Sequence, residues 1–171
     1  MSQSAMSLTI ETNLGDIKIE LYIDEAPKTC WNFLALAASG EYNDSKFHRN
    51  IKNFMIQGGA SSKIKGGGES IWGSSFDDEL HPNLRHNARG IVSMANKGPN
   101  TNKRQFFITY APAPHLDDVY TVFGKVIYGF EVLDAMENEP TGEKDKPTNP
   151  IIIKRIKIHA NPLADRPPPS I

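Results

Sequence analysis

An arginine and a glutamine lie among aromatic and sulfur-containing side chains in the segment Phe47–Gly59. A second segment of the same character, Met94–Thr109, places Gln105 directly before two phenylalanines. Arginine stays protonated at any useful pH, so Arg49 is a poor general base and a good fixed hydrogen-bond donor. Together the segments predict an apolar surface pocket with a few placed donors, the composition of a peptide or small-ligand site. Chemistry there would rest on positioning and electrostatics.

The remaining candidate motifs favour structural roles. Gly66–Gly68 lacks the Gly-Lys-Ser/Thr that completes a phosphate loop, so a flexible turn is expected. His81 and His86 have no further ligand-type neighbours at zinc spacing, and no metal site is expected. Asp77–Glu79 is expected to be a solvated loop. The single cysteine, Cys30, excludes an internal disulfide and favours a reducing compartment.

The composition is that of a water-soluble domain. The chain has 171 residues, of which 39% are hydrophobic and 23% charged, and one domain is expected. Its net charge of −1 argues against direct binding of nucleic acid. The longest apolar run, Phe33–Ala38, is far short of the ~20 residues that cross a membrane, so no membrane partner is expected. No signal peptide is apparent at Met1–Ala5.

Hydrophobic periodicity predicts the elements that must position the two segments. Apolar residues alternate with polar ones from Ile17 to Ile23, which predicts a half-buried strand. Helical spacing predicts one helix between Pro27 and Gly40 and another at residues 129–138. Further strands are predicted at residues 8–10, 54–57, 90–95, 105–109, 121–127 and 151–159. Many short strands without βαβ alternation predict a sandwich or a barrel.

The two segments match long patterns of one known family. Phe47–Gly59 meets F-H-R-x-I-x-x-F-M-x-Q-G-G, and Met94–Thr109 meets M-A-N-x-G-P-N-T-N-x-x-Q-F-F-I-T. In these motifs the chain resembles the cyclophilin family of peptidyl-prolyl isomerases. The resemblance implies a mainly β fold, a closed eight-stranded antiparallel β-barrel capped by two α-helices. It further implies an isomerase domain at residues 7–160, short tails at 1–6 and 161–171, and no cofactor.

The resemblance also implies site roles, position by position. Arg49 matches the catalytic arginine, and Gln57 and Asn96 belong to the same catalytic set. The walls of a proline pocket are matched by Phe54, Met55, Phe107 and Leu116. Positions that hold the substrate backbone are matched by Gln57, Ala95, Asn96 and Gln105. The substrate-binding set is completed by His115, where many members have tryptophan, and Tyr120, where many have histidine.

These residue types suit rotation about an X–Pro bond in a proline-containing peptide or protein. Amide resonance holds the barrier to that rotation at ~18–20 kcal/mol. The prolyl nitrogen regains a lone pair in the twisted state, so a donor such as Arg49 stabilises mainly the transition state. The rival reading is a proline-peptide binding module in a larger assembly, where turnover is incidental.

Departures from the family pattern bear on specificity. Lys103 and Arg104 replace small residues before Gln105 and predict a gate that favours acidic or phosphorylated side chains. His115 is smaller and more polar than tryptophan, which predicts weakened binding of cyclosporin, the family's macrocyclic inhibitor. Lys52-Asn53 replaces the commoner Pro-Gly, and asparagine tolerates the left-handed conformation that glycine adopts there.

A finer resemblance predicts the cellular setting. His115-Leu116-Asp117 and Tyr120–Gly124 resemble the small single-domain cyclophilin-like group associated with spliceosomes. That resemblance predicts splicing factors as partners, a monomeric protein, and a location in the nucleus, the cytoplasm or both.

Overall fold

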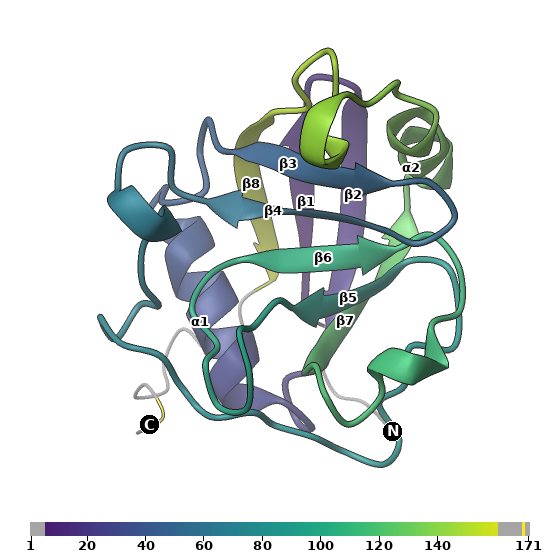
Figure 1. Ribbon diagram of the computed structural model, residues 1–171. Coiled ribbons are helices and arrows are strands. Elements are labelled where there is room, and N and C mark those ends of the chain that lie inside the picture. Colours follow the sequence, from purple (N-terminus) through teal and green to yellow (C-terminus); the bar gives the residue numbers. More distant parts are fainter. Residues whose placement is uncertain (1–5, 161–168, 170–171) are drawn as a thin grey trace.

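Eight antiparallel strands curl around one apolar core (Figure 1). The computed structural model describes residues 6–160 and Pro169, so nearly all of the tail predicted at 161–171 lies outside the described residues. The strands are β1 (Met6–Thr12), β2 (Gly15–Leu21), β3 (Lys46–Ile51), β4 (Met55–Ala60), β5 (Ile91–Met94), β6 (Phe106–Thr109), β7 (Val122–Tyr128) and β8 (Ile153–Ala160). The helices are α1 (Pro27–Ala38) and α2 (Phe130–Glu137), with 3₁₀ turns at Lys65–Gly67, Pro114–Leu116 and Glu143–Asp145.

The sheet order is β3-β4-β6-β5-β7-β2-β1-β8. The two outer strands meet only over the short segments 44–47 and 151–153. These share a bridge between Lys46 and Ile152. They also share three backbone bonds, from the amides of Phe47, Asp44 and Ile153 to the carbonyls of Ile151, Ile153 and Ser45, 2.9, 2.7 and 2.8 Å. The mainly β architecture with two helices is therefore confirmed, whereas a fully closed barrel overstates the contact between β3 and β8. Figure 1 shows α1 and α2 at opposite ends of the curled sheet.

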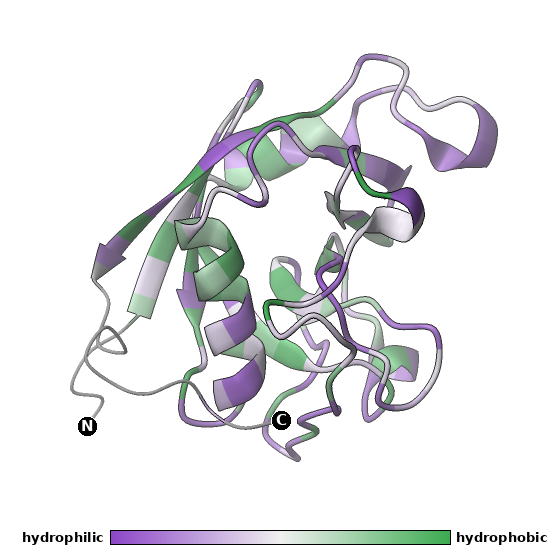
Figure 2. Ribbon diagram, turned by 90° about the vertical axis from the view of Figure 1, so that its left-hand side faces the viewer, coloured by the Kyte–Doolittle hydropathy of each residue, from purple (hydrophilic) through white to green (hydrophobic). Residues whose placement is uncertain are grey.

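Alternation of apolar and polar residues explains β1 and β2. Figure 2 shows the hydropathy of the residues along the ribbon. Every second residue of β1 is buried, and β2 continues the pattern from Ile17. These residues face a core centred on Phe33 of α1, whose ring lies 5.1–5.2 Å from the rings of Tyr42, Phe106 and Phe123. Aromatic rings at such separations attract one another beyond the area that they bury.

The segment 77–79 contributes more than a solvated loop, because Glu79 caps α1. Its carboxylate accepts bonds from the amides of Lys28 and Thr29, 3.1 and 2.7 Å, and from the Thr29 hydroxyl, 2.7 Å. Amides in the first helical turn have no hydrogen-bond partner within the helix, so the carboxylate supplies acceptors for them. Its negative charge also interacts favourably with the positive end of the helix dipole. The expectation of a solvated loop was wrong for this residue.

A second apolar cluster lies apart from the core. It comprises Met55, Phe107, Ala113 and Leu116, with Phe54, Ala95 and Tyr120 packed against it. The first two come from β4 and β6, whereas Leu116 ends a 3₁₀ turn in the β6–β7 connection. No helix in the described part of the chain is long and apolar enough to cross a membrane.

Candidate active site

Three residues predicted to act on the substrate form a row across neighbouring strands. Arg49 of β3 is paired with Gln57 of β4, and Gln57 is paired with Phe107 of β6. Residues directly opposite one another point to the same face of a sheet. That face is the outer one, because the residues flanking Gln57, Ile56 and Gly58, are buried. The row thus places a guanidinium, an amide and a phenyl ring side by side.

A β-bulge at His48 lets Arg49 point outward. Phe47 pairs with Gly58 and Arg49 with Gln57, so His48 is an extra residue without a partner. Without it, Arg49 would share the inward face with the buried Phe47, two residues earlier. Burial and the nearby Arg49 charge lower the pKa of His48, so its ring is neutral at pH 7.

The second apolar cluster surrounds a cavity of about 170 Å³ next to Arg49. The structure brings nearly all predicted wall and backbone positions to it: Phe54, Met55, Gln57, Ala95, Asn96, Phe107, Leu116 and Tyr120. The Tyr120 ring meets that of Phe107 edge-on at 5.5 Å. Among the described residues, none accepts a hydrogen bond from the Arg49 guanidinium, and the residue is exposed. Its donors are therefore available to a bound molecule.

His115 does not line this cavity. Its ring stacks on that of Phe54, with centroids 5.7 Å apart. It therefore contributes to the rim, through Phe54.

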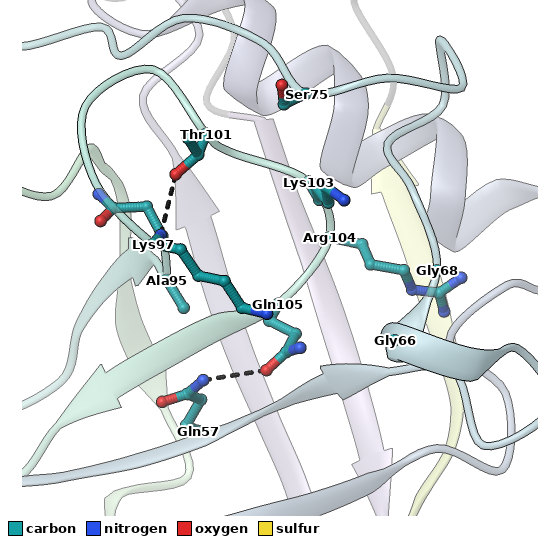
Figure 3. A pocket seen from close by; sticks show the side chains of 11 residues that line it. Gln57, Gly66, Gly68, Ser75, Ala95, Lys97, Thr101, Lys103, Arg104 and Gln105 are labelled. Atoms are coloured by element: carbon teal, nitrogen blue, oxygen red, sulfur yellow. Dashed lines mark hydrogen bonds between the residues drawn. The ribbon is translucent and has the colours of Figure 1, made fainter.

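A larger cavity of about 360 Å³ adjoins the first and shares Gln57, Ala95 and Asn96 with it. The Gln57 amide donates to the Gln105 side-chain oxygen, 3.0 Å, at the boundary (Figure 3). Gln105 lines only the larger cavity. An extended peptide could therefore occupy both cavities, with the glutamine pair between them.

Asn96 uses its side chain to hold the cavity walls. Its amide donates to the Val119 carbonyl, 2.9 Å, and its oxygen accepts from the Gly98 amide, 3.1 Å. Thr101 fixes the same loop by accepting from the Lys97 amide, 2.9 Å. Asn96 thus lies where it was predicted, but its side chain ties the 96–102 loop to the segment that carries Tyr120.

The two predicted gate residues are placed differently. Arg104 is only 2% exposed, donates to the carbonyls of Gly59 and Glu41, and lies over the Tyr42 ring at 5.2 Å. Lys103 is exposed and forms an ion pair with Glu69, 2.8 Å. Arg104 therefore forms part of the wall of the larger cavity. The charge of Lys103 is offset by the Glu69 carboxylate.

Lys97 is a basic residue that the sequence analysis did not single out. It lines the larger cavity, and Figure 3 shows its side chain lying across that cavity toward Gln105. No ion pair within the described residues includes it. Position 97 is variable in the matched pattern, so only the structure reveals it.

Elsewhere in the described chain, no three His, Cys, Asp or Glu side chains could hold a metal ion.

Comparison with known proteins identifies the family of the chain. The profile of the family described as cyclophilin type peptidyl-prolyl cis-trans isomerase/CLD matches residues 7–158. The chain is 62% identical over 159 residues to peptidyl-prolyl cis-trans isomerase CYP18-1 of Arabidopsis thaliana, covering 93% of this chain and 99% of that protein. It is 59% identical over 160 residues to human peptidyl-prolyl cis-trans isomerase-like 3, with the same coverage. A crystal structure of a Cryptosporidium parvum cyclophilin type isomerase has a TM-score of 0.88 and 52% identity, covering 93% of this chain and 100% of that one.

Proposed function

The chain belongs to the cyclophilin family of peptidyl-prolyl cis-trans isomerases, and we propose that it rotates X–Pro bonds in the cavity beside Arg49. The observation that carries the proposal is the row Arg49–Gln57–Phe107. It sets the Arg49 guanidinium, whose donors have no acceptor among the described residues, beside the apolar cavity on one face of the sheet. The family resemblance inferred from the two sequence motifs is confirmed by the profile match.

In the proposed mechanism the proline ring enters the cavity between Phe107, Met55 and Leu116. Rotation breaks the amide resonance and returns a lone pair to the prolyl nitrogen. Arg49 donates to that nitrogen or to the turning carbonyl, an interaction that is strongest in the twisted state. Gln57 is paired with Gln105 and holds the substrate backbone in place. No proton is transferred, which suits a site built around an arginine.

Ground-state binding is expected to be weak. Burial of three ring methylenes contributes only ~2.4 kcal/mol at ~0.8 kcal/mol each. Even with added hydrogen bonds, the dissociation constant of a substrate is expected to be toward the millimolar range. A structure of the Cryptosporidium parvum isomerase was determined in the presence of the dipeptide Ala-Pro. That observation supports proline-containing peptides as ligands of this chain.

The larger cavity is proposed to receive a side chain that precedes the proline. Lys97 lies across it, and the Lys103–Glu69 pair stands at its edge. The acidic preference predicted from Lys103 and Arg104 is therefore reassigned mainly to Lys97. Exposed charge pairs are worth ~0.2–1 kcal/mol, so the preference is a few-fold.

The cellular role is proposed from sequence motifs alone. His115-Leu116-Asp117 and Tyr120–Gly124 support splicing factors as partners and a nuclear location. Recovery of only cytosolic proteins with a tagged chain from whole-cell extract would contradict this assignment.

Exchange NMR on an Ala-Pro-containing peptide tests the proposed cavity. Wild-type protein is expected to give cis–trans exchange peaks, and Met55→Ala is expected to weaken them. Tyr128→Ala removes an aromatic ring that is 70% exposed and lines neither cavity, so it serves as the matched control. Equal exchange in all three proteins would refute the proposal that this cavity holds the proline ring during rotation. Peptide binding without exchange would favour the binding-module alternative.

A further inference from the structure

His86 lies directly behind the wall of the small cavity. Its side chain is fully buried, and its ring stacks nearly parallel on that of Phe107, with centroids 5.8 Å apart and planes at 11°. Its Nδ1 lies 2.9 Å from Asp117 Oδ1, which also accepts the His86 backbone amide at 2.7 Å. Its Nε2 lies 3.0 Å from the Ser93 hydroxyl.

These contacts connect His86 to two wall residues of the small cavity, Phe107 and Leu116. Ser93 of β5 is paired with Phe107 of β6. Asp117 follows the 3₁₀ turn that ends at Leu116, another wall residue. A change at His86 can therefore reach both walls without any contact between His86 and a bound peptide.

Counting protons shows that the chain of hydrogen bonds has two arrangements. The Ser93 hydroxyl also lies 3.0 Å from the Thr121 carbonyl, which can only accept. When His86 is doubly protonated, Nδ1 donates to Asp117, Nε2 donates to Ser93, and Ser93 donates to Thr121. When His86 is neutral with its proton on Nδ1, the single Ser93 proton is shared by two acceptors, Nε2 and the Thr121 carbonyl.

When the Ser93 hydroxyl turns toward His86, the Thr121 carbonyl still has a hydrogen-bond donor. The Thr121 oxygen also accepts the Met94 amide, 2.9 Å, so it keeps a partner in either arrangement. Buried polar groups that stay paired in both states make an exchange between them inexpensive. The hydrogen-bonded series Asp117–His86–Ser93 resembles the triad of a serine hydrolase. Ser93 is fully buried, however, so no substrate can reach its hydroxyl.

The charged and titratable groups around His86 are few. Asp117 faces Nδ1, Arg85 precedes His86 and is paired with Asp118, and His115 lies on the same 3₁₀ turn as Leu116. Burial lowers the pKa of His86, and the bond to Asp117 offsets part of that effect. Burial alone would raise the pKa of Asp117, but the two bonds from His86 lower it. At neutral pH the neutral arrangement is therefore populated.

We infer that His86 is a positioning residue of the isomerase. Its protonation turns the Ser93 hydroxyl and thereby changes the position of the Phe107 ring relative to Leu116 in the cavity wall. The inference rests on the proposed function, because it assumes that the Phe107 cavity holds the proline ring. The cavity wall contacts ground state and transition state alike, so KM is affected more than kcat. Protonation is expected to raise KM about twofold to tenfold, the range that one aromatic contact is worth.

NMR on the protein without substrate tests the switch independently of turnover. As pH is lowered from 8 to 5, the His86 ring nitrogens, the Phe107 ring and the Met94 amide are expected to titrate together. Ser93→Ala is expected to leave His86 titrating while the Met94 amide no longer responds. An unchanged Met94 amide in the wild-type protein, or a His86 ring that does not titrate, would overturn the inference.

The kinetic arm compares KM across the same pH range. Asp117→Asn keeps an oxygen acceptor and removes the charge that favours the imidazolium, so the rise in KM is expected to move to lower pH. His159→Gln, an exposed histidine on β8, is the matched control and is expected to follow the wild type. Superimposable KM profiles for wild type and Asp117→Asn would contradict the inference. Failure of the proposed function would instead appear as full turnover in Arg49→Ala.

Discussion

Arg49 lies directly opposite Gln57 in the β3–β4 ladder, immediately after the bulged residue His48. This pairing turns the guanidinium to the face that carries Phe107, and the apolar cavity begins at that point. The position of one donor relative to one apolar seat therefore depends on local strand geometry.

That geometry predicts a strong effect at Gly58, which pairs with Phe47 before the bulge. A Cβ there would lie 2.7 Å from Phe47 Cδ1 and 3.0 Å from the Lys46 carbonyl oxygen. Gly58→Ala is expected to destabilise the fold by about 1–3 kcal/mol, because overpacking forces β3 to shift. It is also expected to lower kcat by displacing Arg49.

Urea unfolding and peptide turnover measure the two effects. Gly142→Ala is the matched control, since a Cβ at that position meets nothing within 4 Å. Equal stability of Gly58→Ala and Gly142→Ala would show that β3 absorbs the added methyl group without moving.

Stability is expected to fall as pH drops below the ordinary histidine range. Burial lowers the pKa of both His48 and His86 below 6.5 in the folded protein. The unfolded chain then binds more protons at acidic pH, so the histidine contribution is complete above pH 6.5 and is lost as pH falls through the folded pKa values.

Unfolding free energies at pH 7.5 and 5.5 check the sign. The difference is expected to shrink in His86→Gln, whereas the exposed His159→Gln is expected to leave it unchanged. A wild-type protein that is more stable at pH 5.5 would refute the assignment of a lowered pKa to these rings.

Substrate preference is expected to depend on Lys97. Peptides with Glu two or three residues before Pro are expected to have a few-fold higher kcat/KM than those with Lys, at low salt only. Lys97→Gln is expected to remove most of this preference and Lys103→Gln less, because Glu69 already offsets the Lys103 charge. Equal kcat/KM for the two peptides at low salt would rule out an electrostatic gate.

Cyclosporin is expected to bind measurably but weakly. His115 stacks on Phe54 at the rim, where a tryptophan would add a larger apolar face and an indole donor. His115→Trp is therefore expected to tighten binding in calorimetry. No gain in affinity would discard His115 as the cause.

Much of the fold follows from residue patterns. The predicted helix from Pro27 agrees with α1, and Asn53 adopts the left-handed conformation expected where it replaces glycine, φ 67°. Strand β3 escaped detection by periodicity, because the bulge at His48 interrupts the alternation between Phe47 and Arg49. One extra residue is therefore enough to remove the alternating pattern from a strand of six residues.

The site was harder to infer where side chains find partners far along the chain. Arg104 and Lys103 are adjacent in sequence, yet one is buried under backbone carbonyls of Gly59 and Glu41 and the other meets Glu69. His86 was set aside as a metal ligand, and no pattern linked it to Ser93 or Asp117. Such pairings depend on tertiary packing, which a local motif does not encode.

The most direct test of the central claim is the turnover of an X–Pro peptide by Arg49→Ala. Loss of one preorganised donor is expected to lower kcat by ~10²–10³ while the melting temperature stays at the wild-type value, because Arg49 is exposed. Arg155→Ala, which removes a surface arginine paired with Glu11, is expected to retain full activity. Near-wild-type turnover in a folded Arg49→Ala protein would contradict the mechanism.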